Sequence, residues 1–465
     1  MSEKTILTAD ELTELLDARR YSDFMRAIDE YNPIDAAEFL ASLPKERIAI
    51  VFRLLKKDTA AEIFTELDYD LQEMIINKMT DSEISQIIEE LFTDDAVDML
   101  EEMPANVVSR IMKNATPSTR AEINRFLAYP EKSAGRVMTS EFIDLRKGMT
   151  CEEAVSRIRK IGLDKETVYV AYVTDASRVL EGVIQLKHLL FAKPTDLIAD
   201  IMDQNVLYAH THDDQEEVAN MISHYDMIAL PIVDKEQRLV GIVTVDDALD
   251  VLETEATEDI EKMAAMLPSE KPYLKTSVWE VWKQRVPWLI LLMITATFTG
   301  AIISSYESAL GTYAVLTAFL PMLMNTGGNA GGQTSVTIIR GLSLDEIAMG
   351  DIFRVLWKEL RVGAFCGITL AAATFLKVMA LDFRFQIYTT LENGDIQNNL
   401  VIAAIICATV FSAIIFAKIV GTLLPIGAKR IGLDPAVMAS PFITTIVDAV
   451  TLIIYFAIAS AWLKF

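Results

Sequence analysis

Cysteine is scarce in this sequence, because only Cys151, Cys366 and Cys407 occur among its 465 residues. Three cysteines without a C-x-x-C pair provide neither a disulfide framework nor a thiolate metal site, which is typical of proteins kept in reducing surroundings. The first 30 residues also lack an apolar run of signal-peptide length. Both absences predict that the N-terminal half lies in the cytoplasm.

The residues that carry common enzyme chemistry are equally sparse. The four histidines, His188, His210, His212 and His224, lack the helical spacing of a metal site, so surface positions are expected for them. No Walker-type phosphate loop occurs, and covalent catalysis has no support. An intramembrane aspartyl hydrolase would need a second carboxylate at membrane depth beside Asp448, and the apolar runs contain none. The sequence therefore predicts neither an enzyme nor an ATP-driven pump.

Charge is rare in the C-terminal part of the chain. Residues 276–465 hold 12 Lys and Arg against 11 Asp and Glu, which leaves 30 basic and 55 acidic residues in residues 1–275. This distribution predicts a multidomain membrane protein with an acidic soluble part in front of its membrane part. Because the soluble part would repel phosphate, nucleic acid is not expected as a partner. Divalent metal ions or a polycationic peptide would be attracted.

The first 130 residues have the pattern of short helices, and the pattern repeats. Segments 35–55, 59–79 and 95–115 align without gaps at offsets of 24 and 36 residues. Both offsets are multiples of 12, so one helix and one turn form the expected unit. Stacked units of this kind build a helical solenoid. We therefore expect an all-α helical-repeat domain over residues 1–130.

Residues 131–253 contain a second duplication. "EEAVSRI" at 152–158 matches "EEVANMI" at 216–222, and "GVIQLKHLL" at 182–190 matches "GIVTVDDAL" at 241–249. Each unit has the pattern helix, strand, turn, strand, helix. The duplication resembles a tandem pair of cystathionine-β-synthase (CBS) domains, with boundaries expected at 131–199 and 200–253, followed by a connecting helical segment at 254–285.

The resemblance to CBS pairs implies a cleft between the repeats that commonly binds an adenine nucleotide such as ATP. Such pairs typically hold ribose and phosphate with a Gly-hydrophobic-Ser/Thr-x-x-Asp pattern. The second repeat keeps the pattern as Gly241, Thr244 and Asp247, whereas Gln185 and His188 replace the hydroxyl and the carboxylate in the first. ATP binding therefore stays an open alternative.

Residues 286–465 are expected to form an α-helical domain of five membrane-spanning helices. Each uncharged or nearly uncharged run is long enough to cross about 30 Å of hydrocarbon. Basic residues cluster before the first run and after the second and fourth, which places residues 1–285 in the cytoplasm and the C-terminus outside a bacterial plasma (inner) membrane. The five runs are 286–306, 308–339, 362–381, 396–428 and 435–463.

Polar residues interrupt two of these runs. The stretch 321–335 contains Asn325 and Asn329, whose amides suit a hard cation or its water shell, although its glycines could equally form a helix-packing face. Asp448 is the only charge between 435 and 463, where a carboxylate is costly. On a helix it shares a face with Thr444 and Thr445, and with Ser440, Thr451 and Tyr455. We expect this polar stripe to line a water-filled pathway rather than only to bond a neighbouring helix.

One carboxylate per chain is little charge for a cation site. A homodimer with a twofold axis would bring two Asp448 side chains together. Mg²⁺ keeps several of its waters and binds through few carboxylates, so a wide and sparsely charged site suits it.

The whole architecture resembles the MgtE family of magnesium transporters, through the helical repeat, the CBS pair, five segments, "NTGGNAGGQ" and "GLDPAVMASPFITTIVDAV". The resemblance implies a homodimeric Mg²⁺ channel for Mg²⁺ uptake, which closes when intracellular Mg²⁺ binds to its acidic domains. It places Asp448 and nearby Asn329 in the pore and Asp434 at the cytoplasmic mouth. The implied regulatory acids are Glu62, Asp94, Asp98, Glu216, Asp226, Asp247, Asp250, Glu255, Glu258 and Asp259.

Two alternatives remain on the sequence alone. The same architecture could transport another divalent cation such as Co²⁺, although no His or Cys near Asp448 favours a softer metal. Alternatively, the chain could be a nucleotide-sensing membrane receptor without ion flux, which would leave the polar stripe unexplained.

Overall fold

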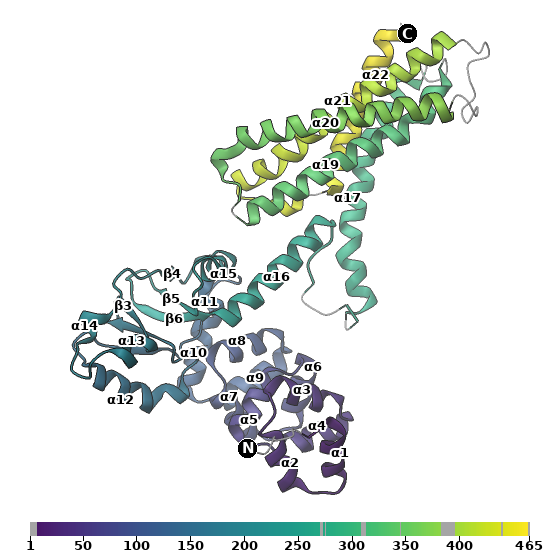
Figure 1. Cartoon of the computed structure of the whole chain (residues 1–465). Coiled ribbons are helices and arrows are strands. Elements are labelled where there is room, and N and C mark those ends of the chain that lie inside the picture. The colour runs from purple at the N-terminus through teal and green to yellow at the C-terminus, as the bar shows by residue number, and fades with distance from the viewer. Residues whose placement is uncertain are drawn as a thin grey trace. The chain divides into compact units, whose positions relative to one another are not determined.

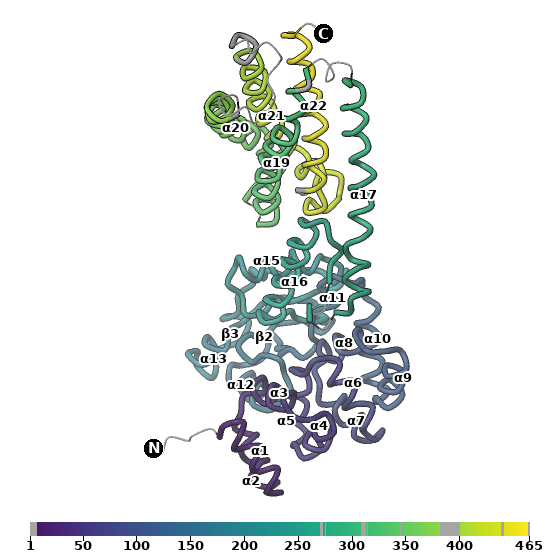
Figure 2. Tube along the Cα trace, turned by 90° about the vertical axis from the view of Figure 1, so that its right-hand side faces the viewer, coloured from purple at the N-terminus to yellow at the C-terminus, as the bar shows by residue number. Residues whose placement is uncertain are grey.

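The computed structural model describes residues 7–269, 273–274, 276–307, 313–344, 346–382, 396–438 and 440–463. The chain divides into two compact units, Met1–Glu253 and Thr254–Phe465, and each is described by itself. Figures 1 and 2 show the course of the chain within each unit.

Ten short helices open the first unit, and each begins twelve residues after the one before it. This confirms the predicted unit of one helix and one turn. Alternate helices pack on each other, as α3 does on α5 and α5 on α7, around buried aromatic side chains such as Phe52 and Phe64. The bounds are α1 Ala9–Asp17, α2 Tyr21–Ile28, α3 Pro33–Ser42, α4 Lys45–Phe52, α5 Lys57–Thr65, α6 Tyr69–Lys78, α7 Asp81–Glu90, α8 Thr93–Glu102, α9 Ala105–Asn114 and α10 Pro117–Leu127.

Side-chain caps fix several of these helix starts. Thr8 and Thr80 each accept a hydrogen bond from the backbone amide three residues on, and the carboxylate of the Glu at that position accepts one from the Thr backbone amide. Asn32 and Thr116 cap α3 and α10, and a proline follows each of them at the first helical position. Because a cap satisfies amide groups that a helix start leaves unpaired, the 12-residue spacing is encoded locally in the sequence.

Two small sheets of identical topology follow, which confirms the predicted duplication (Figure 1). In each sheet the first strand runs parallel to the second, and the second is antiparallel to the third. The short first strands, β1 and β4, were absent from the sequence prediction. The elements are α11 Ala134–Val137, β1 Ile143–Leu145, α12 Cys151–Ile161, η1 Gly162–Asp164, β2 Val170–Thr174, β3 Leu180–Gln185, α13 Leu186–Phe191, α14 Ile198–Ile201, β4 Ala209–His210, α15 Gln215–His224, β5 Ala229–Val233, β6 Leu239–Thr244 and α16 Val245–Met263.

Each sheet is completed by the segment that opens the other repeat. Thr139 exchanges backbone hydrogen bonds with Ile242 of β6, and Asp203 does so with Val183 of β3. A β-carbon on Gly241 would lie 2.6 Å from the sulfur of Met138. Close packing against Met138 therefore explains why position 241 is a glycine, independently of any ligand.

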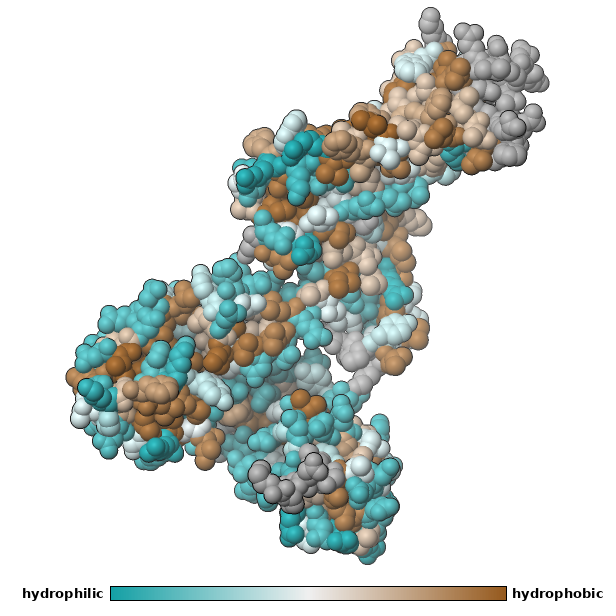
Figure 3. Space-filling model, viewed as in Figure 1, coloured by the Kyte–Doolittle hydropathy of each residue, from teal (hydrophilic) through white to brown (hydrophobic). Residues whose placement is uncertain are grey.

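The second unit is a bundle of long helices, and Figure 3 shows its surface as mostly apolar. Within the described residues, four helical stretches are long and apolar enough to cross a membrane: 278–305, 349–381, 400–430 and 435–463. α19 is about 36 Å long at 1.5 Å per residue and is the fifth long helix. The bounds are α17 Val278–Ser305, η2 Ala314–Phe319, α19 Leu320–Ser343, η3 Met349–Asp351, α20 Ile352–Lys377, η4 Val378–Asp382, α21 Ile396–Arg430, η5 Pro435–Met438 and α22 Ser440–Leu463.

Two expected segments differ from the observed helices. The over-long second run breaks at Leu320, where a 3₁₀ helix gives way to α19, and residues 308–312 of that run lie outside the described residues. The connector expected at 254–285 is no separate helix. Its first ten residues continue α16, and its last eight begin α17. α19 packs on both α21 and α22, so it lies at the centre of the bundle.

Candidate ion pathway and cation-sensing acids

Asp448 lies in α22 where that helix packs on α19. Its side chain is half-buried, and its Oδ1 atom has no hydrogen-bond partner among the described residues. A buried carboxylate oxygen without a partner is costly unless water or a cation satisfies it. This atom is therefore the clearest candidate for contact with a hydrated ion in the second unit.

Gly328 of α19 makes room for this carboxylate. A β-carbon at Gly328 would lie 2.7 Å from Cγ2 of Thr444 and 3.3 Å from Oδ1 of Asp448. The helix-packing interpretation of the glycine-rich stretch is therefore confirmed at Gly328. Its glycines pack against α22. This packing places the carboxylate of Asp448 beside Gly328, the residue before Asn329.

An adjoining face of α19 carries an exposed polar stripe, which we call the amide stripe and define as Asn325, Asn329, Gln333 and Thr337. All four side chains are exposed, and they lie four residues apart. The amide nitrogen of Asn329 donates to the oxygen of Asn325 at 3.2 Å. Because side-chain amides at membrane depth face protein or water rather than lipid, this stripe marks a surface that hydrocarbon does not cover.

The stripe predicted on α22 is only partly correct. Thr444 and Thr445 are half-buried near Asp448, but the hydroxyl of Thr445 donates back to Pro441. Thr451 is 1% exposed, and the buried hydroxyl of Tyr455 donates to the backbone of Leu316 at 3.0 Å.

The C-terminal part of the α22 stripe thus faces the interior of the bundle, where neighbouring elements cover it. The continuous exposed stripe is on α19. Its signal in the sequence was the four-residue spacing from Asn325 to Thr337.

Asp434 lies just before η5 and is paired within the same unit. Its Oδ2 atom accepts from Nζ of Lys262 at 2.6 Å, and its Oδ1 atom from the amide of Ala436 at 2.7 Å. Lys262 also forms an ion pair with Glu258. The hydroxyl of Ser343, at the end of α19, donates to Asp259 at 3.2 Å. Three of the predicted regulatory acids, Glu258, Asp259 and Asp434, therefore lie together at one end of the bundle.

A second group of acids gathers in the first unit, between α8 and the start of α16. Asp94 is 7% exposed, and its Oδ1 atom has no partner among the residues that the structure describes. Burial, then repulsion from Asp247 and Asp95, raises the pKa of Asp94 well above its usual value. Burial and Asp247 likewise raise the pKa of Asp95 to about 7. Such shifts indicate acids that crowd together without enough positive charge between them.

Glu166 belongs to this acidic group, although no sequence motif predicts it. Burial, followed by repulsion from Asp247 and Asp95, raises its pKa to about 7. Of the other predicted acids, Asp250 is exposed near Glu66, and repulsion between these two adds to burial in raising the pKa of Glu66. Asp98 lies on the same helix as Asp94 and is exposed.

The remaining predicted regulatory acids are not brought to this group. Glu62 is exposed on α5, Glu216 lies in the first turn of α15, Asp226 lies in the turn after α15, and Glu255 lies along α16. Among the described residues, no three His, Cys, Asp or Glu side chains stand close enough to hold one metal ion. The described acids therefore do not form a closed cage of three or more such side chains.

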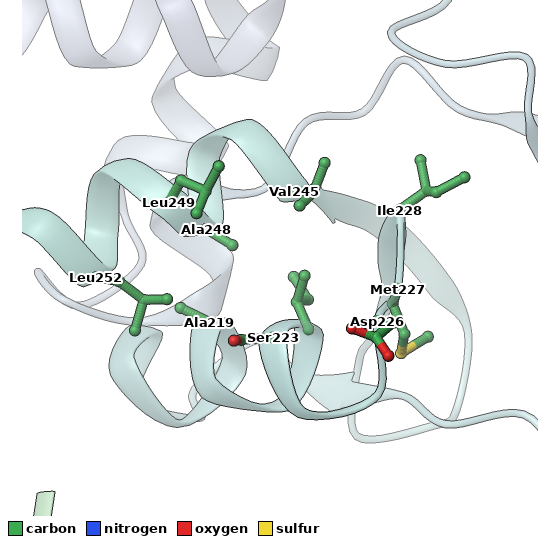
Figure 4. Close-up of a pocket in the computed structure, with 10 residues that line it drawn as sticks. Ala219, Ser223, Asp226, Met227, Ile228, Val245, Ala248, Leu249 and Leu252 are labelled. Carbon is green, nitrogen blue, oxygen red and sulfur yellow. The ribbon is translucent and has the colours of Figure 1, made fainter. Parts of the chain in front are cut away.

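The structure offers limited support for nucleotide binding. The hydroxyl of Thr244 donates to the carboxylate of Asp247, so both groups of the predicted pattern are engaged with each other. A cavity of about 390 Å³ opens between α15 and α16 (Figure 4), where Asp226 and Ser223 are its polar lining residues. Its other lining side chains are aliphatic or Met, and all of them come from the second repeat. It is therefore not the expected cleft between repeats.

Comparison with known proteins agrees with this architecture. Residues 320–458 match the family MgtE, described as a divalent cation transporter, residues 31–132 match the MgtE intracellular N domain, and residues 198–254 match the CBS domain. The chain is 36% identical to the magnesium transporter MgtE of Thermus thermophilus, over the full length of both chains. It is 31% identical to the magnesium transporter MgtE of Bacillus subtilis, over 98% of each chain.

A solved structure described as the soluble part of a magnesium transporter is also similar. It shares 30% sequence identity and a TM-score of 0.52, and the match covers 53% of this chain and 98% of that one. The full-length relatives and the long apolar helices together establish a multi-pass membrane protein that is a transporter rather than an enzyme. The chain belongs to the MgtE family of divalent cation transporters.

Proposed function

We propose that this chain transports Mg²⁺ through a channel-type pathway that passes Asp448 and the amide stripe. The observation that carries the proposal is the unpaired Oδ1 atom of Asp448, held against Gly328 one residue from Asn329. The two full-length relatives named above are magnesium transporters by name, which supports Mg²⁺ as the ion.

The chemistry of these groups suits Mg²⁺ with its water shell. Mg²⁺ is a hard cation that takes oxygen ligands and gives up its waters reluctantly. Asp448 supplies one charge, while Asn325 and Asn329 supply amide groups that can accept from or donate to bound waters. Such a site can pass a hydrated ion without the tight cage that would trap it. Co²⁺ remains the runner-up, and competition between Co²⁺ and Mg²⁺ for flux tests it.

We further propose that the transporter is a homodimer. One copy leaves the amide stripe exposed, and α17, a 28-residue helix, has none of its most apolar stretch buried. If a twofold axis ran beside α19, the stripe would face water and the second copy rather than lipid. Two copies of Asp448 would then face one ion.

Regulation is the less direct part of the proposal. Mg²⁺ on the cytoplasmic side would bind among the acids Asp94, Asp247 and their neighbours, and at Glu258, Asp259 and Asp434, and would close the pathway. The proposed location is the bacterial inner membrane, with the first unit in the cytoplasm and the C-terminus outside, as the basic residues indicate. As the alternative regulatory ligand we propose ATP, held at Thr244 and Asp247.

The test is Mg²⁺ flux into proteoliposomes. Asp448→Ala is expected to reduce flux to the level of empty liposomes while the protein still inserts and keeps its oligomeric state. Asp351→Asn, which changes an exposed carboxyl of the same unit, serves as the matched control and should transport like the wild type. Wild-type flux in the Asp448→Ala variant would overturn the pathway.

A further inference from the structure

A lysine occupies the centre of the acidic group at the end of α16. Nζ of Lys262 lies 2.6 Å from Oδ2 of Asp434, and the same ammonium is paired with Glu258 one helical turn earlier. The side chains are 22%, 34% and 14% exposed, so all three are largely withdrawn from water. One protein cation thus bridges α16 and the segment before η5.

The contacts around Lys262 dock the end of α16 against the segment before η5 and the end of α19. Asp259 accepts from Ser343, while Met263 packs against Ile339 and Ala436. A lysine side chain is ordinarily charged at physiological pH, so the ammonium of Lys262 supplies a positive charge to this contact.

Other acids lie beside this group. Repulsion from Asp434 acts on Asp259, and Glu255 adds to it from one turn earlier on α16. Without Lys262, Glu258 and Asp434 lose the ion pairs that its ammonium forms with them, so the repulsion among Glu258, Asp259 and Asp434 is less neutralised. Partly buried charges of like sign repel strongly when nothing neutralises them.

We propose that Lys262 is a built-in cation that holds the end of α16 against η5 and the end of α19, and so sets the Mg²⁺ concentration at which the pathway closes. The inference rests on the proposed function and adds a positioning residue to its regulation. The lysine contributes part of the closing force in the absence of Mg²⁺. Less repulsion among the carboxylates then remains for bound divalent ions to neutralise.

The experiment is flux from proteoliposomes with free Mg²⁺ varied on the side of the first unit. Lys262→Gln is expected to raise the half-inhibitory Mg²⁺ concentration by about three- to tenfold, as expected for losing a partly buried ion pair. Lys262→Arg, which keeps the charge, should stay close to the wild type. Lys358→Gln, an exposed lysine on α20 of the same unit, is the matched control and should not shift the curve.

A second readout is independent of transport. In Mg²⁺-free buffer, protease cleavage between α16 and α17 is expected to be faster in Lys262→Gln than in wild type or Lys262→Arg. Lys262→Met keeps the aliphatic stem and is used if the Gln variant does not insert.

The two proposals fail in different ways. A wild-type protein without Mg²⁺ flux would overturn the proposed function. Normal wild-type flux combined with an unchanged or lower half-inhibitory concentration in Lys262→Gln, or an unchanged cleavage rate, would overturn the role of Lys262.

Discussion

Asp448 of α22 lies beside Gly328 of α19, where a β-carbon would lie 3.3 Å from the Oδ1 atom of the acid. The same β-carbon would lie 2.7 Å from Cγ2 of Thr444. A close helix contact at Gly328 therefore sets the position of Asp448 relative to α19, because a side chain at this position would force Thr444 to shift.

Gly328→Ala is expected to reduce Mg²⁺ flux strongly and to destabilise the protein by about 1–3 kcal/mol, because the added methyl group forces α19 and α22 apart. Flux and thermal unfolding in detergent measure both effects. Gly427→Ala on α21 is the control, since a β-carbon there meets nothing within 4 Å. Equal behaviour of the two variants would contradict the close-contact argument.

Asn329→Ala is expected to lower Mg²⁺ flux by about fivefold, which corresponds to a hydrogen bond of about 1 kcal/mol to the passing water shell. Asn325→Ala should have a similar effect, because the two amides are hydrogen-bonded to each other. Thermal stability should change little, since both side chains are exposed. A fall in stability with unchanged flux per folded protein would assign these residues a packing role instead.

A buried ion pair joins three helices of the second unit. Lys418 of α21 lies 3.1 Å from Glu359 of α20, with side chains 9% and 12% exposed, and the hydroxyl of Thr334 on α19 donates to the same carboxylate. Glu359→Gln should destabilise the protein by about 3–5 kcal/mol, because it leaves Lys418 buried without its partner.

The double variant Glu359→Gln with Lys418→Met provides the control for this prediction. It should recover most of the lost stability, since it removes both buried charges. Thermal unfolding of the two variants in one detergent decides the question. A double variant that is less stable than Glu359→Gln alone would show that the pair contributes more than mutual neutralisation.

The acidic group of the first unit predicts a pH dependence in EDTA. Burial and mutual repulsion raise the pKa of Asp95 and of Glu166 to about 7, above the unfolded values near 4. Acids with a raised pKa stabilise the folded state fully below the unfolded pKa and lose that contribution as pH rises through the folded one. Thermal stability of the full chain should therefore fall between about pH 4 and pH 7.

Two further measurements sharpen the pH prediction. Glu166→Gln should flatten the decline, whereas Glu217→Gln, at an exposed position on α15, should not. Added Mg²⁺ should restore stability most at pH 8, where the carboxylates are charged. A decline of the same slope in both variants would exclude the acidic group as its source.

The helical repeat could be read from the sequence because its period is local. The helix starts and apolar positions recur every twelve residues, and side chains such as Thr80 and Thr116 cap several of these starts, so the pattern depends on near neighbours in the chain. The duplicated α/β units were visible for the same reason. The strand exchange through Thr139 and Asp203 could not be predicted from the sequence, because it depends on pairing between segments far apart in the chain.

Only part of the candidate site could be predicted from the sequence. Asp448 stood out as a lone charge, but helical spacing alone assigned Thr451 and Tyr455 to a water-lined face. Packing against α19 and η2 buries both of them. Glu166 and Lys262 were missed because their importance comes from tertiary neighbours, Asp247 for the first and Asp434 for the second.

The most direct test of the central claim asks whether the amide stripe lines the Mg²⁺ pathway. Asn329→Cys is introduced after replacing Cys151, Cys366 and Cys407, and a positively charged thiol reagent is added during flux. We expect the reagent to block Mg²⁺ flux, and we expect Mg²⁺ to slow the reaction of the reagent with the new thiol. In the control variant Phe365→Cys, whose thiol lies at an exposed apolar position of α20, the reagent should leave the flux unchanged. Full labelling of Asn329→Cys with unchanged Mg²⁺ flux would contradict it.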